Sequence, residues 1–182
     1  GFTLHSADTL DFNFASLAPG GTRLRVVGNL PYNISTPLIF NLLEQAQIIA
    51  DMHFMLQLEV VERLAASPGS KDWGRLGVMT QFRCEVEQLF EVPPEAFYPP
   101  PKVRSAVVRL TPHPEPQYPN VDPASLGRVV TQAFSQRRKT LRNNFKGMME
   151  DSDIGGLTID PGARAETLSI ADLVAITVHL HG

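Results

Sequence analysis

The sequence predicts an α/β body followed by a small helical domain, and three observations support this division. Over residues 1–110, short apolar runs typical of strands alternate with stretches of helical periodicity. Residues 111–120 read TPHPEPQYPN, with four prolines and almost no apolar side chains, as expected for a linker. Over residues 121–182 the periodicity is helical alone. Alternation of strands and helices in the body favours a sheet that is mostly parallel.

Five runs in the body predict strands, and segments between them predict helices. The strands are expected at residues 2–8, 23–29, 52–58, 85–93 and 103–110. The helices are expected at residues 37–46, 59–67 and 75–83. Thr36 is the predicted N-cap of the first helix, because Pro37 suits the first helical position, where no N–H is needed. A proline-rich connection between the last two strands predicts that they form an antiparallel pair.

Two helical segments are expected in the C-terminal domain, at residues 122–149 and 167–180. Between Arg128 and Lys146 the first segment carries six basic side chains and no acidic ones. On one continuous helix, three of these would form a basic stripe beside the apolar face: Arg138, Arg142 and Lys146. Such a stripe is either a contact for nucleic-acid phosphates or a solvated helix face.

The overall composition sets bounds on the class of protein. The chain has 182 residues, a net charge of −3 and a pI near 5.9, so its average charge indicates no nucleic-acid partner. The single cysteine, Cys84, excludes an intrachain disulfide and fits a reducing cytoplasm. No apolar run approaches the ~20 residues of a membrane span. His179 and His181 lie near the C-terminal end without other ligand-type neighbours, so no metal site is predicted.

The most informative stretch is GNLPYNIS, residues 28–35, which follows an apolar run. In open α/β sheets ligands bind beyond the carboxyl ends of strands, and Asn29 is expected at such an end. Pro31 restricts Leu30 to an extended conformation, which holds the Leu30 carbonyl near the Asn29 side-chain carbonyl. Two such acceptors suit an amine, and the Tyr32 ring offers a surface for stacking of a base. These residues therefore predict a site for the exocyclic amine of adenine.

Taken alone, this stretch also fits a structural role, with Asn29 at a helix entry and Tyr32 in packing. Five further stretches accompany it: HFMLQLEVVERL, GRLGVMTQF, VPPEAFYPPPKVRSAVVRL, AFSQRRKTLRN and DPGARAETLSIADL. In this order, they and NLPYNIS resemble the KsgA/RsmA family of ribosomal RNA adenine dimethyltransferases. Members of that family use S-adenosylmethionine to dimethylate two adjacent adenosines near the 3′ end of small-subunit ribosomal RNA. The resemblance covers nearly all of the chain.

The resemblance implies a fold and the roles of several residues. The body would be part of a Rossmann-like methyltransferase sheet, mostly parallel with an antiparallel last strand pair. Asn29 and the Leu30 carbonyl, in the turn made by Pro31, would hold the target amine. Tyr32 would stack on one face of the flipped adenine, and Phe97 would close the other face.

The cofactor side of the site is less complete in the sequence. Asp8 matches the family's acidic residue that accepts from the adenine amine of S-adenosylmethionine, and Thr9 and Asn29 would also contact the cofactor. Without the resemblance, Asp8 reads as an ordinary turn residue. The Gly-rich loop and the ribose-binding acidic residue of the family should precede Asp8, and the sequence contains neither. We therefore expect a fragment that lacks an N-terminal segment and is inactive alone.

For RNA, the resemblance favours the interpretation of the basic residues as phosphate contacts. The helical domain would bind small-subunit ribosomal RNA, within the immature small ribosomal subunit. We expect the protein to act as a cytoplasmic monomer without a membrane partner. The residues predicted to contact RNA are Lys102, Arg104, Arg137, Arg138, Lys139, Arg142 and Lys146.

Two other functions stay open at this point. The absent Gly-rich loop favours a non-catalytic ribosome-binding module that takes part in subunit assembly. The Erm antibiotic-resistance methyltransferases, which act on large-subunit ribosomal RNA, share the N-L-P-Y type of motif. They are less similar in the QRRKTLRN and RAETLS stretches. The presence of Asn29, Tyr32 and Phe97 favours a methyltransferase over a binding module.

Overall fold

The computed structural model describes residues 1–31 and 33–181, and the chain folds into two compact units. Unit 1 comprises Gly1–Val61 and Arg83–Glu115, and unit 2 comprises Glu62–Phe82 and Pro116–Gly182. The division expected from the sequence was continuous along the chain, whereas here residues 62–82 group with the C-terminal part.

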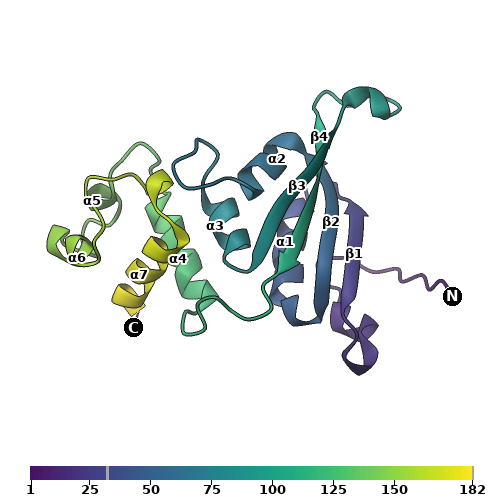
Figure 1. Ribbon diagram of the computed structural model, residues 1–182, viewed down its shortest axis with the longest axis horizontal. Helices are drawn as coiled ribbons and strands as arrows, with labels where there is room; N and C mark the ends of the chain where they lie inside the picture. The colour runs from purple at the N-terminus through teal and green to yellow at the C-terminus, as the bar shows by residue number, and fades with distance from the viewer. Residues whose placement is uncertain (32, 182) are drawn as a thin grey trace. The chain divides into compact units, whose positions relative to one another are not determined.

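The regular elements are shown in Figure 1. Unit 1 contains β1 (Leu24–Asn29), α1 (Ser35–Glu44), β2 (Ile49–Gln57), β3 (Cys84–Val92) and β4 (Ser105–Pro112). The chain passes from unit 1 to unit 2 within α2 (Leu58–Leu64). Unit 2 contains α3 (Arg75–Gln81), α4 (Pro123–Ala133), α5 (Leu141–Asn144), α6 (Asp151–Gly156) and α7 (Ile170–His181). Short 3₁₀ helices occur at Phe14–Leu17, Pro19–Gly21, Ala46–Ile48, Pro94–Ala96 and Ala165–Thr167.

The four strands form one sheet in the order β1-β2-β4-β3. β1 and β2 are parallel, and β3 and β4 form the expected antiparallel pair. β4 is also antiparallel to β2, so that parallel pairing is confined to β1 and β2 in the described part of the sheet. The strand expected at residues 2–8 is absent, and that prediction was wrong. Phe2 and Leu4 are 90% and 80% exposed, because this apolar run pairs with none of the described strands.

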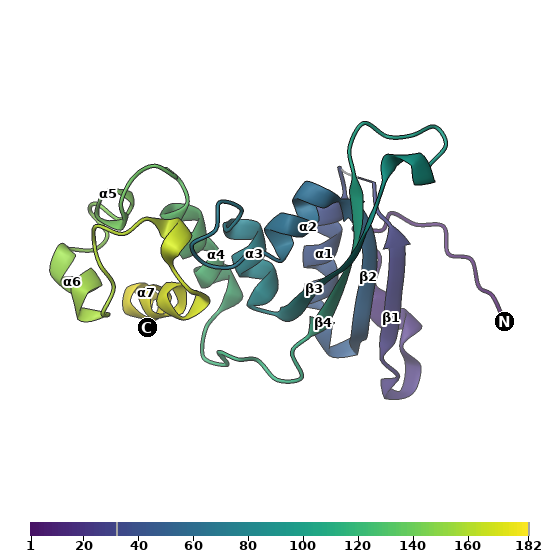
Figure 2. The same ribbon diagram turned by 45° about the horizontal axis from the view of Figure 1, so that its top comes forward.

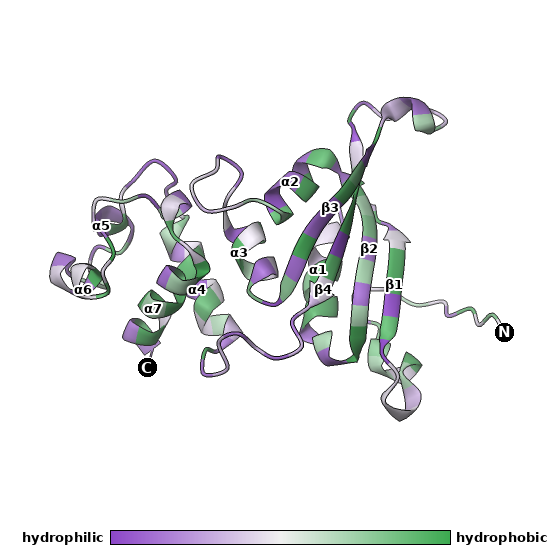
Figure 3. Ribbon diagram, in the orientation of Figure 1, coloured by the Kyte–Doolittle hydropathy of each residue, from purple (hydrophilic) through white to green (hydrophobic). Residues whose placement is uncertain are grey.

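Alternation along the strands builds the core of unit 1 on one face of the sheet. Burial alternates along much of β2, and green apolar and purple polar segments alternate along β3 in Figure 3. α1 lies against the sheet in Figures 1 and 2 and buries Leu38, Ile39, Leu42 and Leu43. The strands contribute the buried residues Met52, Phe54, Leu56, Ala106, Val108 and Leu110. The predicted helix start was displaced: α1 begins at Ser35, with Ile34 as N-cap, so Thr36 is not the cap.

Trp73 explains why residues 62–82 belong to unit 2. Its side chain is 2% exposed, and its Nε1–H donates to the Leu168 carbonyl oxygen at 2.8 Å. Val78 and Phe82 are buried in the same core as Trp73, together with residues of α4 and α7. The Trp73 ring packs in this core and its N–H forms a hydrogen bond there, so residues 62–82 are held against the C-terminal part of the chain.

The long helix expected at residues 122–149 is broken, and that prediction was wrong. α4 ends at Ala133, and α5 is a single turn at Leu141–Asn144. Asn144 stabilises this break, because its buried side-chain amide donates to the Ala133 carbonyl oxygen at 2.6 Å. This bond satisfies one of the carbonyls left open at the end of a helix and turns the chain back on α4.

We predict that Trp73→Phe destabilises unit 2 by about 2–4 kcal/mol, because the buried Leu168 carbonyl loses its donor and the core loses volume. Chemical denaturation followed by circular dichroism measures this, since Trp73 is the only tryptophan and its fluorescence is lost. Val178→Ala is the control, because Val178 is half-exposed on α7 and should change stability by less than about 0.5 kcal/mol. Equal effects of the two changes would contradict the role of Trp73.

Cys84 allows a second check of the packing in unit 1. Burial raises the pKa of its thiol from 9.0 to about 12, so a reagent that attacks thiolates should not label the native protein at pH 8. The folded-state pKa lies above the unfolded one, so the free energy of unfolding should fall as pH rises from 9.0 toward about 12. Val178→Cys combined with Cys84→Ser supplies an exposed thiol as control. Labelling of native Cys84 as fast as of this control would show that β3 is not packed as described.

Candidate active site

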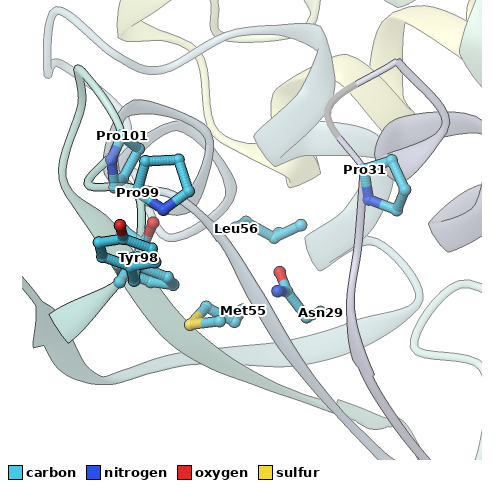
Figure 4. Close-up of a pocket in the computed structure, with 9 residues that line it drawn as sticks. Asn29, Pro31, Met55, Leu56, Tyr98, Pro99 and Pro101 are labelled. Carbon is cyan, nitrogen blue, oxygen red and sulfur yellow. The ribbon is translucent and has the colours of Figure 1, made fainter. Parts of the chain in front are cut away.

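A pocket of about 490 Å³ lies in unit 1, beyond the ends of β1 and β2 (Figure 4). In Figure 4, Tyr98, Pro99 and Pro101 lie on one side of the pocket and Pro31 on the other, with Asn29, Met55 and Leu56 between them. Every described lining residue is uncharged, which suits a neutral planar ligand better than an ion. The lining residues are Asn29, Pro31, Met55, Leu56, Phe97, Tyr98, Pro99, Pro101 and Ser105.

Pairing of β1 with β2 places Asn29 at the floor of the pocket. Asn29 is the last residue of β1 and pairs with Met55, and Leu30 N–H then donates to the Met55 carbonyl oxygen at 3.3 Å. The Asn29 side chain is exposed, as expected for a polar group beyond a strand end. The parallel pairing therefore fixes both the position of this amide and the start of the turn that follows it.

The turn after Asn29 is shaped by its neighbours on both sides. A Cβ atom at Gly28 would lie 3.1 Å from Leu30 Cδ2, so glycine permits the Leu30 side chain to fold back into the core. The Pro31 carbonyl oxygen accepts from Ile34 N at 3.2 Å and from Ser35 N at 3.1 Å, which starts α1. Across the described residues no backbone N–H donates to the Leu30 carbonyl. The Leu30 carbonyl follows Asn29 directly in the chain and stays the second acceptor that the motif predicts.

The opposite wall comes from the link between β3 and β4. Phe97 follows the 3₁₀ turn Pro94–Ala96, and its N–H donates to the Pro94 carbonyl oxygen at 3.1 Å. Its side chain is half-buried, whereas that of Tyr98, the next residue, is fully exposed. The Tyr98–Pro99 peptide bond is cis. Two consecutive aromatic rings therefore border the pocket at different depths.

The structure brings together three of the residues predicted for the target base. Asn29, Pro31 and Phe97 line one pocket although Pro31 and Phe97 are 66 positions apart in the sequence (97 − 31). Leu30 contributes its backbone, because its side chain is buried, and Tyr32 lies outside the described residues. Sequence reasoning missed Met55, Leu56, Tyr98, Pro99, Pro101 and Ser105. Proline enrichment around Phe97 was a usable signal for its neighbours, but Met55 and Ser105 enter through strand register alone.

The two residues predicted only for the cofactor lie elsewhere in unit 1. Asp8 forms a turn, in which its carboxylate Oδ1 accepts from Leu10 N at 2.9 Å and its carbonyl oxygen accepts from Asp11 N at 3.2 Å. Neither Asp8 nor Thr9 lines the pocket. Asp8 presents an acceptor carboxylate on an exposed turn, and the described residues that line the pocket include Asn29 alone of the three expected at the cofactor. The pocket by itself therefore does not gather the residues expected to hold S-adenosylmethionine.

Two arginines on the sheet form ion pairs, and neither is among the described residues that line the pocket. Arg25 Nε donates to Asp51 Oδ1 at 2.8 Å, and this bond holds the pKa of the Asp51 carboxyl below its usual value. Arg109 pairs with Glu87 across β3 and β4. Across residues 1–31 and 33–181 no cluster of His, Cys, Asp and Glu could hold a metal ion, and no helix is long and apolar enough to cross a membrane.

The predicted RNA contacts divide into paired and unpaired cations. Arg104 forms an ion pair with Glu91 at 2.7 Å, whereas Lys102 is exposed and forms no ion pair in the described part of the chain. In unit 2, Arg142 pairs with Asp151 at 2.6 Å. Arg137 pairs with Glu166 at 3.4 Å and donates to the Lys71 carbonyl.

The basic stripe expected on one helix does not form, because α4 ends before it. Arg138 lies in the turns between α4 and α5, Arg142 lies in α5, and Lys146 follows α5. Three side chains are exposed and form no ion pair with any described residue: Arg138, Lys139 and Lys146. The cations of this segment that have no described acidic partner therefore lie in turns and not on a helix face. Arg137 and Arg142 form ion pairs with Glu166 and Asp151.

Comparison with known proteins identifies relatives of the whole chain. The family model described as "Ribosomal RNA adenine dimethylase" matches residues 2–181. Ribosomal RNA small subunit methyltransferase A of Pseudomonas aeruginosa is 60% identical over 179 residues, which are 98% of this chain and 67% of that protein. The protein of the same name from Nitrosococcus oceani is 60% identical over 174 residues, which are 96% of this chain and 66% of that protein. The chain thus spans about two thirds of the length of these relatives.

Solved structures agree with the fold. A dimethyladenosine transferase from Plasmodium falciparum superposes with a TM-score of 0.70 at 26% identity, over 85% of this chain and 66% of that one. The 23S rRNA methyltransferase ErmE superposes with a TM-score of 0.70 over 97% of this chain and 70% of that one. At 23% identity, the second likeness concerns the fold alone. The fold class expected from the sequence, a Rossmann-like methyltransferase sheet followed by helices, is confirmed.

Proposed function

The chain belongs to the ribosomal RNA adenine dimethylase family, and on this premise we propose that it forms the target-base side of a methyltransferase. The enzyme would transfer methyl groups from S-adenosylmethionine to the exocyclic amines of two adjacent adenosines in small-subunit ribosomal RNA. The observation that carries this proposal is the uncharged pocket in which Asn29 and Phe97 meet from distant parts of the chain. The names of the relatives from Pseudomonas aeruginosa and Nitrosococcus oceani support the small-subunit substrate over the large-subunit one.

The chemical task of the pocket is to make a poor nucleophile reactive. The lone pair of the adenine amine is delocalised into the ring, so the amine must become pyramidal before it can attack. The Asn29 side-chain carbonyl and the Leu30 main-chain carbonyl would each accept from one amine N–H. These bonds strengthen as positive charge develops on the nitrogen, and they therefore stabilise the transition state more than the ground state.

The two faces of the adenine ring would be covered by aromatic side chains. Phe97 borders the pocket and supports this role on one face, while Tyr32 is proposed for the other. Enclosure of a base in this way offsets part of the cost of removing it from its stack in RNA. No catalytic base is required, because a methylated amine carrying positive charge loses its proton readily to solvent or to a nearby carbonyl.

The methyl donor of the reaction would be bound mostly by groups outside this chain. S-adenosylmethionine supplies an electrophilic methyl group when bound. We propose that Asp8, Thr9 and Asn29 contribute acceptors on the edge of that site, with further groups from the part of the relatives that this chain does not span. Asn29 is the residue common to both sides, since it lies at the floor of the pocket and at the end of β1.

RNA binding is proposed for the exposed cations near the pocket and in unit 2. Lys102 would contact phosphates beside the target base, and Arg138, Lys139 and Lys146 would contact phosphates from the turns around α5. Arg104, Arg137 and Arg142 have acidic partners, so their contribution would require exchange of an ion pair for a phosphate. The proposed partner is the immature small ribosomal subunit, bound by a monomer in the cytoplasm.

A second candidate function is a ribosome-binding module without catalysis. The observation in its favour is the set of exposed cations in unit 2 that form no ion pair with any described residue: Arg138, Lys139 and Lys146. Binding and catalysis are separable by experiment, because the first depends on cations and the second also depends on Asn29.

We predict that Asn29→Ala lowers methyl transfer to unmethylated small subunits by about 100-fold or more, the scale for loss of one group that stabilises developing charge. Transfer from labelled S-adenosylmethionine is measured with the chain alone and with the chain extended by the N-terminal part of the Pseudomonas aeruginosa relative. Asn120→Ala, in the exposed proline-rich segment, is the matched control. Full activity of the extended Asn29→Ala variant would refute the proposed role of the pocket. Inactivity of the extended chain itself would favour the binding module.

We predict that Arg138→Gln and Lys139→Gln each weaken binding to small-subunit ribosomal RNA. Each change should lower the slope of log Kd against log salt concentration by about 0.7, the value for loss of one single-strand phosphate contact. Filter binding over a range of salt concentrations measures this slope. Arg23→Gln removes an exposed cation of unit 1 that is outside the proposed contacts, and it should leave the slope unchanged. Identical slopes for all three variants would exclude the turns around α5 as an RNA contact.

A further inference from the structure

Tyr98 borders the pocket but does not belong to the set of residues that hold the target base. Its side chain is fully exposed, whereas Phe97 beside it is half-buried. We propose that Tyr98 stacks on the nucleotide adjacent to the target adenosine, so that consecutive aromatic residues hold consecutive bases. The proposal rests on the proposed function, since it requires single-stranded RNA in this pocket.

The backbone separates the two rings. Phe97 has φ −118° and ψ 154°, an extended conformation in which neighbouring side chains point to opposite sides of the chain. Phe97 is accordingly turned toward the protein and Tyr98 toward solvent, although both border the same pocket. In Figure 4 the Tyr98 ring lies on the side of the pocket opposite Pro31. A base held near Asn29 would thus have Tyr98 at the rim, where the RNA chain must leave.

Tyr98 contributes nothing visible to the stability of the fold. Its ring is solvent-exposed, and in the described residues it makes no aromatic contact and no side-chain hydrogen bond. Prolines surround it in the sequence PPEAFYPPP, residues 93–101, and each proline fixes its own φ. The ring is therefore presented on a stiff segment, and binding would cost little loss of conformational freedom.

A cation lies close to this ring in the sequence. Lys102 follows the last proline, is exposed, and forms no ion pair within the described parts of the chain. An aromatic platform combined with a nearby cation is the arrangement by which proteins bind single-stranded nucleic acid, with the ring on a base and the cation on the backbone. The pocket wall is uncharged, so the phosphates would be held at the rim while the target base enters.

The proposed reaction on two adjacent adenosines would require a binding site for the base beside the target. In the proposed reaction, two adjacent adenosines are methylated in turn at the single Asn29 amide. While one adenine is in the pocket, its neighbour must be prevented from returning to the RNA stack. Stacking of that neighbour on Tyr98 keeps the strand open and leaves the second adenine close to the pocket.

The test uses short RNAs in which one of the two adjacent adenosines is replaced by 2-aminopurine, each position in turn. The fluorescence of this base is quenched when it stacks on an aromatic ring. We expect quenching with the wild-type chain and with Tyr98→Phe. We expect loss of quenching and about 5- to 150-fold weaker binding with Tyr98→Ala, the range for loss of one base–aromatic stack. Phe90→Ala is the matched control, because Phe90 is another exposed aromatic that does not line the pocket.

Three outcomes separate this inference from the proposed function. Loss of quenching in Tyr98→Ala, with quenching retained in Tyr98→Phe and Phe90→Ala, supports the stacking role. Unchanged quenching in Tyr98→Ala, while Asn29→Ala weakens binding, overturns the stacking role and leaves the proposed function intact. Absence of RNA binding by the wild-type chain, or binding insensitive to both changes, overturns the proposed function and this inference together.

Discussion

The pairing of β4 with both β2 and β3 is the constraint on which the site depends. Ser105, the first residue of β4, pairs with Gln57 at the end of β2 and with Val92 at the end of β3. The Arg104 carbonyl also accepts from Leu58 N at 2.9 Å, which continues this contact beyond the strands. One wall of the pocket follows β1, which β2 positions, and the other wall follows β3. A change of register at β4 would therefore separate the two walls, because each wall is attached to a different neighbour of this strand.

The distribution of charge complements this geometry. The pocket is lined by uncharged residues, the cations of the open sheet are paired with Asp51 and Glu87, and unpaired cations occur at Lys102 and around α5. A neutral base is best bound by an uncharged surface, whereas the charged RNA backbone is best bound by cations. In the proposed function, Asn29 and the Leu30 carbonyl would select the amine of adenine, while exposed cations would attract phosphates without regard to sequence. Different residues would then provide specificity and affinity, and the pocket would avoid the cost of burying a charge.

Elements defined by neighbouring residues could be predicted from the sequence, whereas features that depend on residues far apart in the chain could not. β2, α3 and α7 were predictable, because their apolar spacing is local. Residues 2–8 have the composition of a strand but no described partner, and a strand depends on its partner more than on its own sequence. The end of α4 is stabilised by the side chain of Asn144, 11 residues beyond Ala133 (144 − 133), which no local pattern reveals. In the site, the motif identified Asn29, whereas Met55 and Ser105 enter through strand register alone.

Under the proposed function, the position of Asn29 would let one amide serve both halves of a methyl-transfer site. It ends β1, where a parallel strand opens toward ligands, and the turn behind it is closed by the bonds from Ile34 and Ser35 to Pro31. Leu30 is buried in the core and Gly28 leaves room for its side chain, so the residues on either side of Asn29 are held by packing. Under the proposed function, this packing would hold the Asn29 acceptor in place before the substrate arrives, and stabilisation of developing charge requires such preorganisation.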